Sequence, residues 1–162
     1  MSSDTPSPAI YVDADACPVK DEALRVAERH GLPLIFVSNA WMRLPDSPLV
    51  RRVVVPEGAD AADDWIAERI GPLDIAVTAD IPLAARCLKM GAQAIGPTGK
   101  PFTEAGIGMA LAMRDLSAHL RETGESKGYN AGFTRQDRSR FLEALELAAR
   151  RAIAAAAAAG GR

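Results

Sequence analysis

Four short apolar runs constrain the fold of this chain more strongly than any other feature of its sequence. They cover residues 9–12, 34–37, 53–55 and 75–77, and none alternates apolar with polar side chains. Continuous apolar runs of this length are typical of parallel strands that helices cover on both faces. We therefore expect four buried strands.

Segments with helical periodicity separate these runs. The segment between the first two runs has one apolar face, made of Val19, Ala23, Val26, Ala27 and His30. Gly31 ends that helix, residues 60–70 predict a second helix, and a third helix follows Asp80. Residues 93–95 form a weak fifth strand. Repeated strand–helix alternation implies right-handed crossovers, so the prediction is a single three-layer α/β domain with a mostly parallel sheet.

The second half of the chain carries helices and loops. Residues 96–101 are expected to form a loop, 104–121 a long helix, and 125–132 a flexible segment. A last helix begins near Thr134, which is a good N-cap because Asp137 follows three residues later.

The domain bounds follow from these elements. We expect a disordered segment over residues 1–8, one domain over 9–153, and a frayed tail rich in Ala and Gly over 154–162. A chain of 162 residues is long enough to bury a core without a disulfide or a structural metal.

Composition excludes several classes of protein. With 48% hydrophobic and 25% charged residues, the chain is not of the disordered type. No apolar run approaches the ~18 residues of a membrane span, and the N-terminus lacks the features of a secretory signal. The two cysteines, Cys17 and Cys87, are too few for a disulfide scaffold. We expect a cytoplasmic protein with no membrane partner and no disulfide; the oligomeric state stays open.

Charge is distributed unevenly along the chain. The first 99 residues hold 9 Lys and Arg against 14 Asp and Glu, whereas the remainder holds 10 against 7. Such a division fits either a cation site beside an anion-binding surface or a chance scatter of solvated side chains.

Five aspartates follow the expected strands. Asp13 and Asp15 come after the first strand, Asp60 and Asp63 after the third, and Asp80 after the fourth. Ligands of open α/β sheets bind outside the carboxyl ends of the strands, so these carboxylates are placed to converge. Clustered carboxylates repel one another, and oxygen ligands favour Mg²⁺ or Mn²⁺. The sequence therefore predicts a divalent metal site at this edge.

Each aspartate also has a structural explanation. Asp80 precedes Ile81 and Pro82 and is a good N-cap, while Asp60 and Asp15 are placed to cap the second and first helices. Only one member of the Asp13–Asp15 pair can be a cap, and capping does not prevent an oxygen from binding a metal.

Five further residues are candidates for substrate binding. Lys20 lies one turn into the first helix and either holds a phosphate or pairs with Asp15. Asn39 and Thr78 follow strands, where they bind a ligand or satisfy local backbone groups. Arg135 and Arg138 share one helical face and either meet a phosphate backbone or remain solvated.

Other catalytic motifs are absent or incomplete. Residues 96–100 resemble a phosphate-binding loop, but Ala94 stands where its first glycine is required and Pro101 where Ser or Thr is. His30 and His119 lie on helices and are expected to have structural roles. Cys87 is expected in the core.

The motifs around these aspartates resemble those of the bacterial YaiI/YqxD family. The resemblance rests on YVDADACPVK at 11–20, VSNA at 37–40, GADAADDWI at 58–66, VTADIPLA at 77–84, RDL at 114–116, and Asp137-Arg138 followed by Phe141. It covers roughly residues 9–150. Where the family usually carries a Gly-Gly-Pro turn before its last helix, this chain has Lys127-Gly128-Tyr129.

The resemblance implies a fold and an activity. The family is grouped with PIN-like domains, which are metal-dependent ribonucleases that gather acidic residues at the carboxyl edge of a parallel sheet. Asp13, Asp60 or Asp63, and Asp80 would then be metal-site acids, and the expected function is hydrolysis of an RNA phosphodiester.

Two alternatives stay open. A strand ending in Asp-x-Asp is also the signature of haloacid-dehalogenase-like phosphatases, in which the first Asp is the nucleophile. Their late acidic pair follows the threonine motif, whereas Asp63-Asp64 precedes Thr78 here. The other alternative is a non-catalytic RNA-binding module.

Overall fold

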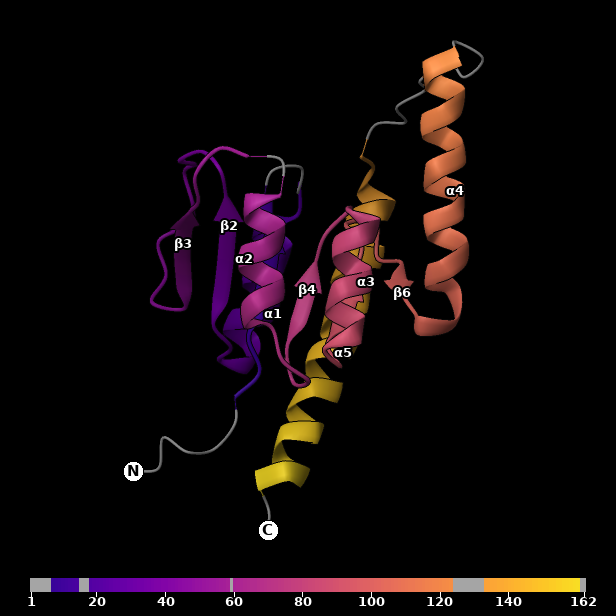
Figure 1. Cartoon of the computed structure of the whole chain (residues 1–162). Coiled ribbons are helices and arrows are strands. Elements are labelled where there is room, and N and C mark those ends of the chain that lie inside the picture. The colour runs from indigo at the N-terminus through magenta and orange to yellow at the C-terminus, as the bar shows by residue number, and fades with distance from the viewer. Residues whose placement is uncertain (1–6, 15–17, 59, 124–132, 161–162) are drawn as a thin grey trace.

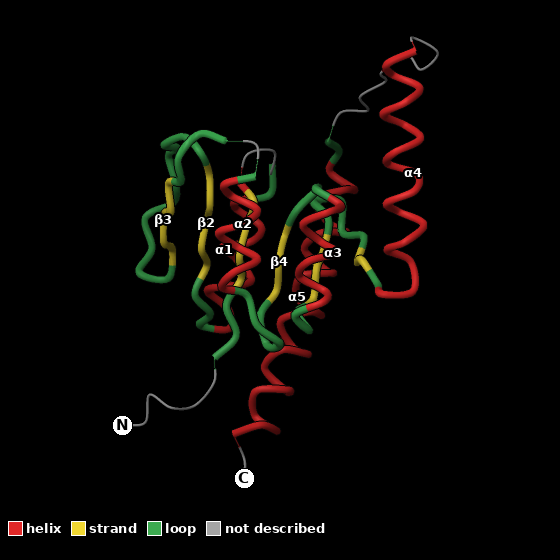
Figure 2. The backbone as a smooth tube through the Cα atoms, viewed as in Figure 1, coloured by secondary structure: helices red, strands yellow, loops and turns green. Residues whose placement is uncertain are grey.

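The structure is a computed structural model that describes residues 7–14, 18–58, 60–123 and 133–160 (Figures 1 and 2). Strands and helices alternate through the first two thirds of the chain, as expected, except that no helix separates the second strand from the third. The elements are β1 (Ile10–Asp13), α1 (Lys20–His30), β2 (Leu34–Ser38), β3 (Val50–Val54), α2 (Ala61–Arg69), β4 (Ile75–Val77), α3 (Ile81–Lys89), β5 (Gln93–Ile95), β6 (Pro101–Phe102), α4 (Glu104–Thr123) and α5 (Arg135–Gly160).

The sheet has six strands in the order β3-β2-β1-β4-β5-β6. Neighbouring strands from β3 to β5 are parallel, and only β6 pairs antiparallel, with β5. The chain builds outward from β1 to β3 and then crosses back to β4, so the order reverses between β1 and β4. The carboxyl ends of the parallel strands share one edge, toward which the arrowheads of β2, β3 and β4 point in Figure 1. The prediction of a mostly parallel α/β sheet is confirmed.

Helices cover both faces of the sheet and form a three-layer domain. One core packs Val12, Phe36 and Ile75 against α1 and α5, and the other packs Val37 and Ala76 against α2 and α3. In Figure 1, α2 and α3 lie in front of the sheet while α5 runs behind it. All five residues of β2 are buried, which explains why its sequence does not alternate.

Two strands differ from expectation. β3 begins at Val50 and includes Arg51 and Arg52, whereas the apolar run suggested 53–55. As an edge strand, β3 leaves one side open, and exposed arginines there need no apolar cover. β6 lies within and just after the expected loop 96–101 because two residues suffice to pair with β5; such a short strand carries no periodicity.

α5 closes one face of the sheet and is longer than expected. Its N-terminus is the predicted capping box: the Asp137 amide donates to Thr134 Oγ1, and the Thr134 amide donates to Asp137 Oδ2, both at 3.0 Å. The helix continues to Gly160 instead of fraying after residue 153. Alanine is the best helix former, and Ala156 is packed at 5% exposure.

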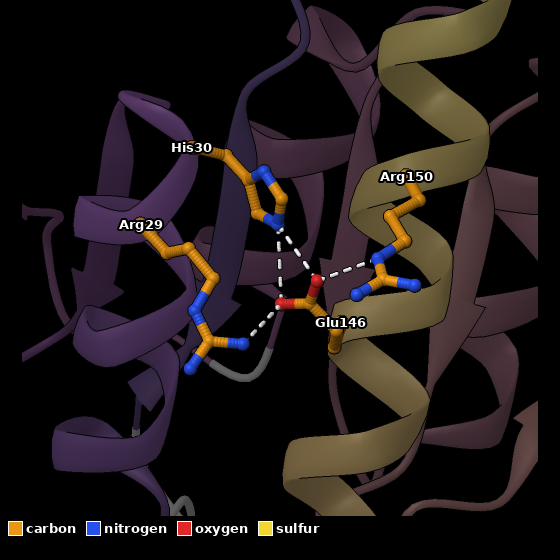
Figure 3. A network of polar contacts seen from close by, with 4 residues as sticks. All are labelled: Arg29, His30, Glu146 and Arg150. Carbon is orange, nitrogen blue, oxygen red and sulfur yellow. Dashed lines mark hydrogen bonds and ion pairs between the residues drawn. The ribbon is translucent and has the colours of Figure 1, made fainter.

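A charged network fastens α5 to α1 (Figure 3). The carboxylate of Glu146 forms ion pairs with Arg29 Nη1 at 3.3 Å and with His30 Nε2 at 3.0 Å. It also pairs with Arg150 Nε, one turn further along α5, at 2.7 Å. Burial alone would raise the pKa of Glu146, but His30 and Arg150 outweigh it and the pKa is lowered. His30 therefore has a structural role. Within the described ranges, no helix is both long and apolar enough to cross a membrane.

Candidate functional site

The candidate site lies where the strand order reverses, at the carboxyl ends of β1 and β4. Asp13 is the last residue of β1, and Thr78 follows β4, its direct neighbour in the sheet. The loops that leave this edge are visible above the strands in Figure 2. Crevices of this kind are the usual ligand sites of open parallel sheets. The fold thus places Asp13 where a ligand is expected.

Hydrogen bonds connect Asp13 to the start of α3. Buried Thr78 donates from Oγ1 to Asp13 Oδ2 at 2.9 Å, and the same oxygen accepts from the Asp80 amide at 2.9 Å. Asp80 caps α3, because its Oδ1 accepts the Leu83 amide at 2.8 Å. Thr78 therefore holds two of the predicted acids in fixed positions, and the predicted capping role of Asp80 is confirmed.

Asp63 brings the start of α2 into the same cluster. Burial raises the pKa of Asp63 to about 6, with further increases from the charges of Asp80, Asp13 and Asp60. Nearby carboxylates raise a pKa in this way, so Asp13, Asp60 and Asp80 all lie within electrostatic reach of Asp63. Asp60 occupies the N-cap position of α2, but its side chain makes no capping hydrogen bond. The structural explanation for Asp60 is therefore wrong.

Neighbouring Asp64 has a different environment. Arg86 on α3 donates from Nη1 to Asp64 Oδ1 at 2.7 Å and thereby neutralises that carboxylate. Arg86 lowers the pKa of Asp63 only as the last and smallest contribution. Of these two adjacent aspartates, Asp63 alone faces the acidic cluster without a paired cation.

The donor chemistry of this cluster fits a hard divalent cation. All four side chains offer carboxylate oxygens, and their repulsion is the cost that a cation removes. Within the described residues, no group of three Asp, Glu, His or Cys side chains is arranged so that it could hold a metal ion. Mg²⁺ commonly uses only one or two carboxylates, with waters and substrate phosphate completing its shell. The fit therefore rests on donor type and charge.

Of the next four predicted site residues, the structure describes three. Asp15 lies outside the described residues. Lys20 begins α1 half-buried, and Asn39 is exposed just beyond β2. Arg135 is exposed at the start of α5.

Arg138 makes its contacts with other residues of the protein. Its Nη1 donates to the Pro18 carbonyl at 3.2 Å and to Glu22 Oε2 at 3.4 Å, and its guanidinium lies 4.9 Å from the Phe133 ring centroid. These contacts fasten α5 beside the start of α1. A structural role explains Arg138 better than phosphate binding.

Two relevant residues were missed by the sequence analysis. Glu22 contacts Arg138 and keeps its Oε1 buried with no hydrogen-bond partner among the described residues. Arg86 decides which of Asp63 and Asp64 remains unpaired. Both depend on contacts between separate elements, and the only sequence signal for Arg86 is its position one turn after Pro82.

Cys87 has no place in this site. It is fully buried in the core beside α2, as expected, and burial raises the pKa of its thiol to about 12. A thiol of that pKa is not a nucleophile at neutral pH.

Comparison with known proteins identifies relatives of this chain. The family model "Uncharacterized BCR, YaiI/YqxD family" matches residues 11–151. A UPF0178 protein from Rhizobium etli is 62% identical over 153 residues, which cover 94% of this chain and 99% of the relative. A UPF0178 protein from Parvibaculum lavamentivorans is 66% identical over 137 residues, covering 85% and 90%. No solved structure matches the chain. The match spans both the acidic cluster and most of α5, and the chain belongs to the YaiI/YqxD family.

Proposed function

We propose that this protein is a divalent-metal-dependent phosphodiesterase that hydrolyses RNA. The observation that carries the proposal is the acidic cluster at the strand-order reversal, where burial and three neighbouring carboxylates raise the pKa of Asp63 to about 6. One or two of the carboxylates of Asp13, Asp63 and Asp80 would bind Mg²⁺ or Mn²⁺ directly, with waters and the substrate phosphate completing the shell, and Asp60 would lie at the rim. Asp15, in the same motif as Asp13, is a further candidate ligand.

The bound ion would lower the pKa of an attacking water and stabilise the leaving oxygen. Groups of the protein hold the acidic side chains in position for this chemistry. Thr78 and the Leu83 amide orient the carboxylates of Asp13 and Asp80 before any ligand arrives. Preorganised charge of this kind costs little reorganisation during the reaction. The carboxylates themselves are poor nucleophiles toward phosphate, because two anions repel each other.

Polar side chains around the same edge would contact the phosphate backbone. Lys20, at the start of α1, would hold the phosphate that is cleaved, together with Asn39 just beyond the neighbouring strand. Arg135 is exposed at the start of α5, whose N-terminal turn lies close to Pro18 through Arg138. The basic residues at the start of α5 and the resemblance to PIN-like ribonucleases favour RNA as the substrate.

The test compares two aspartate variants on the same RNA. Purified protein is incubated with mixed RNA and Mn²⁺, and cleavage by Asp80→Asn is measured beside cleavage by Asp64→Asn. Asp80→Asn should lose about a hundredfold or more in rate, since it removes a group that stabilises charge in the transition state. Asp64→Asn should retain activity, because Asp64 is paired with Arg86.

The other outcomes identify the alternatives. Equal cleavage by wild type and Asp80→Asn would show a contaminating nuclease. No cleavage with RNA binding intact would favour the non-catalytic module. Turnover of a small phosphomonoester, lost in Asp13→Asn, would establish the phosphatase instead.

A further inference from the structure

Trp41 is 67% exposed in the segment that links β2 to β3. This segment crosses between two parallel strands without a helix and carries the indole on its outer side. Trp41 belongs to neither core of the domain. Burial of an indole is favourable because its apolar area is large. A tryptophan that stays exposed to water is therefore an informative feature.

Arg52 fixes one side of this indole. The carbon atom of its guanidinium lies 4.7 Å from the centroid of the Trp41 ring, and its Nε donates to the Met42 carbonyl at 3.1 Å. The hydrogen bond and the cation–π contact together hold Arg52 and Trp41 as one unit. Because the indole is two-thirds exposed, much of its π surface remains available to a ligand.

A second Arg–Trp pair provides an internal comparison. Arg69 lies 4.1 Å from the Trp65 ring, but Trp65 is half-buried on α2, packs beside Tyr11 with ring centroids 6.2 Å apart, and joins the α2–α3 core. That pair contributes to packing. The Trp41–Arg52 pair is built in the same way but has no such role.

The surroundings of the Trp41–Arg52 pair are positively charged. Arg43 and Arg52 are exposed, and Asp46 is the one acidic residue between Asn39 and Val55. Neither arginine forms an ion pair with another residue in the described ranges. Arg51, the neighbour of Arg52 in β3, points to the opposite face of the sheet. Aromatic rings interleaved with free cations are the usual platform for single-stranded nucleic acid, in which every base has a π-face.

The pair and the acidic cluster lie on nearby strands of the sheet. Arg52 is on β3 and Asp13 ends β1, with only β2 between these two strands. Trp41 lies three residues beyond Ser38, the end of β2, and exposed Asn39 lies between them along the chain.

We infer that Trp41 stacks on an unpaired base of single-stranded RNA while Arg52 and Arg43 contact the adjoining phosphates. This inference rests on the proposed function for its choice of RNA and specifies that the substrate is unpaired. A duplex keeps its bases stacked on one another and does not offer them to the indole.

The test measures binding with divalent cations removed by EDTA, so that no cleavage occurs. The anisotropy of a labelled oligouridylate of about ten nucleotides, within the usual site size for one domain, is followed as protein is added. Trp41→Ala should weaken binding about tenfold or more, as expected for loss of one stacked base. Arg52→Ala should also weaken binding, Trp41→Phe should retain most of it, and the matched control Arg69→Ala should leave it unchanged.

Tryptophan fluorescence gives a second readout on the same platform. The chain has two tryptophans, so Trp65→Phe leaves Trp41 as the single emitter. Oligouridylate should quench its emission to saturation, and a hairpin duplex of the same length should quench it far less. If Trp65→Phe fails to fold, the anisotropy comparison still decides the question in the unaltered background.

Opposite results overturn the inference. Equal affinity of Trp41→Ala and wild type for oligouridylate, or equal affinity of wild type for single strand and duplex, would do so, as would a dimer that Trp41→Ala dissociates. The two proposals fail separately: loss of Trp41-dependent binding with Asp80-dependent cleavage intact refutes only the platform, and the reverse pattern refutes only the hydrolysis.

Discussion

Asp63 is the residue whose ionisation should most affect the stability of this protein. Its pKa is about 6 in the folded chain, against about 3.9 in an unfolded one. The folded state therefore binds the proton of Asp63 more tightly than the unfolded state does. Ionisation of Asp63 lowers the free energy of unfolding, and this penalty is absent below about pH 4 and complete once the pH has risen through 6. Asp63→Asn removes the penalty. We expect a gain of about 1 kcal/mol in the free energy of unfolding at pH 7.5, after discounting for solvent screening, and none at pH 3.5.

Urea denaturation at these two pH values measures the effect, with Asp64→Asn as the matched control. Asp64 is paired with Arg86, so its substitution should be neutral or slightly destabilising at pH 7.5. A gain in both variants, or the same gain at pH 3.5, would show that the acidic cluster is not its source. Saturating Mg²⁺ should reduce the advantage of Asp63→Asn, because a bound cation stabilises the ionised carboxylates of the wild type.

For individual residues, the sequence predicted the position of a candidate site residue only where that position follows directly from the end of a strand. Asp13 and Asp80 follow apolar runs and are found at strand ends of one edge, as predicted. The difference between Asp63 and Asp64 was not predictable, because it depends on Arg86, 22 residues away from Asp64 on another helix. Glu22 and Arg138 likewise meet across 116 residues. Contacts of this kind follow from the packing of helices, which local patterns do not report.

Among the elements, the turn between β5 and β6 approaches the backbone of α5 closely. Gly99 has a φ of +89°, and a Cβ added there would lie 2.5 Å from the carbonyl carbon and oxygen of Arg140. Gly99→Ala must therefore strain the turn and also push the hairpin away from the helix. We expect a loss of about 2–3 kcal/mol in the free energy of unfolding, measured by urea denaturation.

Gly31→Ala is the matched control for this prediction. Gly31 also has a positive φ, +67°, but a Cβ added at this position would have nothing within 4 Å. Only the backbone strain applies there, and a loss of about 1 kcal/mol is expected. If both substitutions cost the same, the contact between the hairpin and Arg140 contributes no stability.

Elements were predictable in proportion to the number of residues that repeat their pattern. The helix expected over 104–121 is found as α4, Glu104–Thr123, because twenty residues give several turns of periodicity. β6 has two residues and offers none. β3 was expected too late because its first residues include two arginines, which an edge strand tolerates and a central strand does not. The α/β alternation itself was predicted from the strands that are buried on both faces.

For the whole molecule, α5 divides into a part that closes the core and a part that does not. Phe141 and Leu145 are fully buried against the sheet, whereas among the residues from 154 to 159 only Ala156 is buried. Deleting residues 154–162 should change the free energy of unfolding by less than about 1 kcal/mol, close to the burial of one methyl group.

Ending the chain after Thr134 should instead prevent folding. Loss of Phe141 and Leu145 alone costs about 5–10 kcal/mol, comparable with the entire stability of a small domain. Circular dichroism and urea denaturation of the two truncated chains distinguish these expectations. A cooperative unfolding transition in the chain that ends at Thr134 would show that the sheet is stable without α5.

The packing of α5 against β1 also has a consequence for synthesis. β1 is synthesised well before α5, and α5 together with α1 covers one face of β1. A nascent chain can pair β1 with β2 and β4 early, but Ile10, Val12 and Phe36 stay without their cover until Phe141 and Leu145 emerge. Exposed strands of this kind are prone to aggregate. We therefore expect this protein to complete its folding only once α5 has emerged, with a nascent intermediate that depends on chaperones to shield its uncovered face.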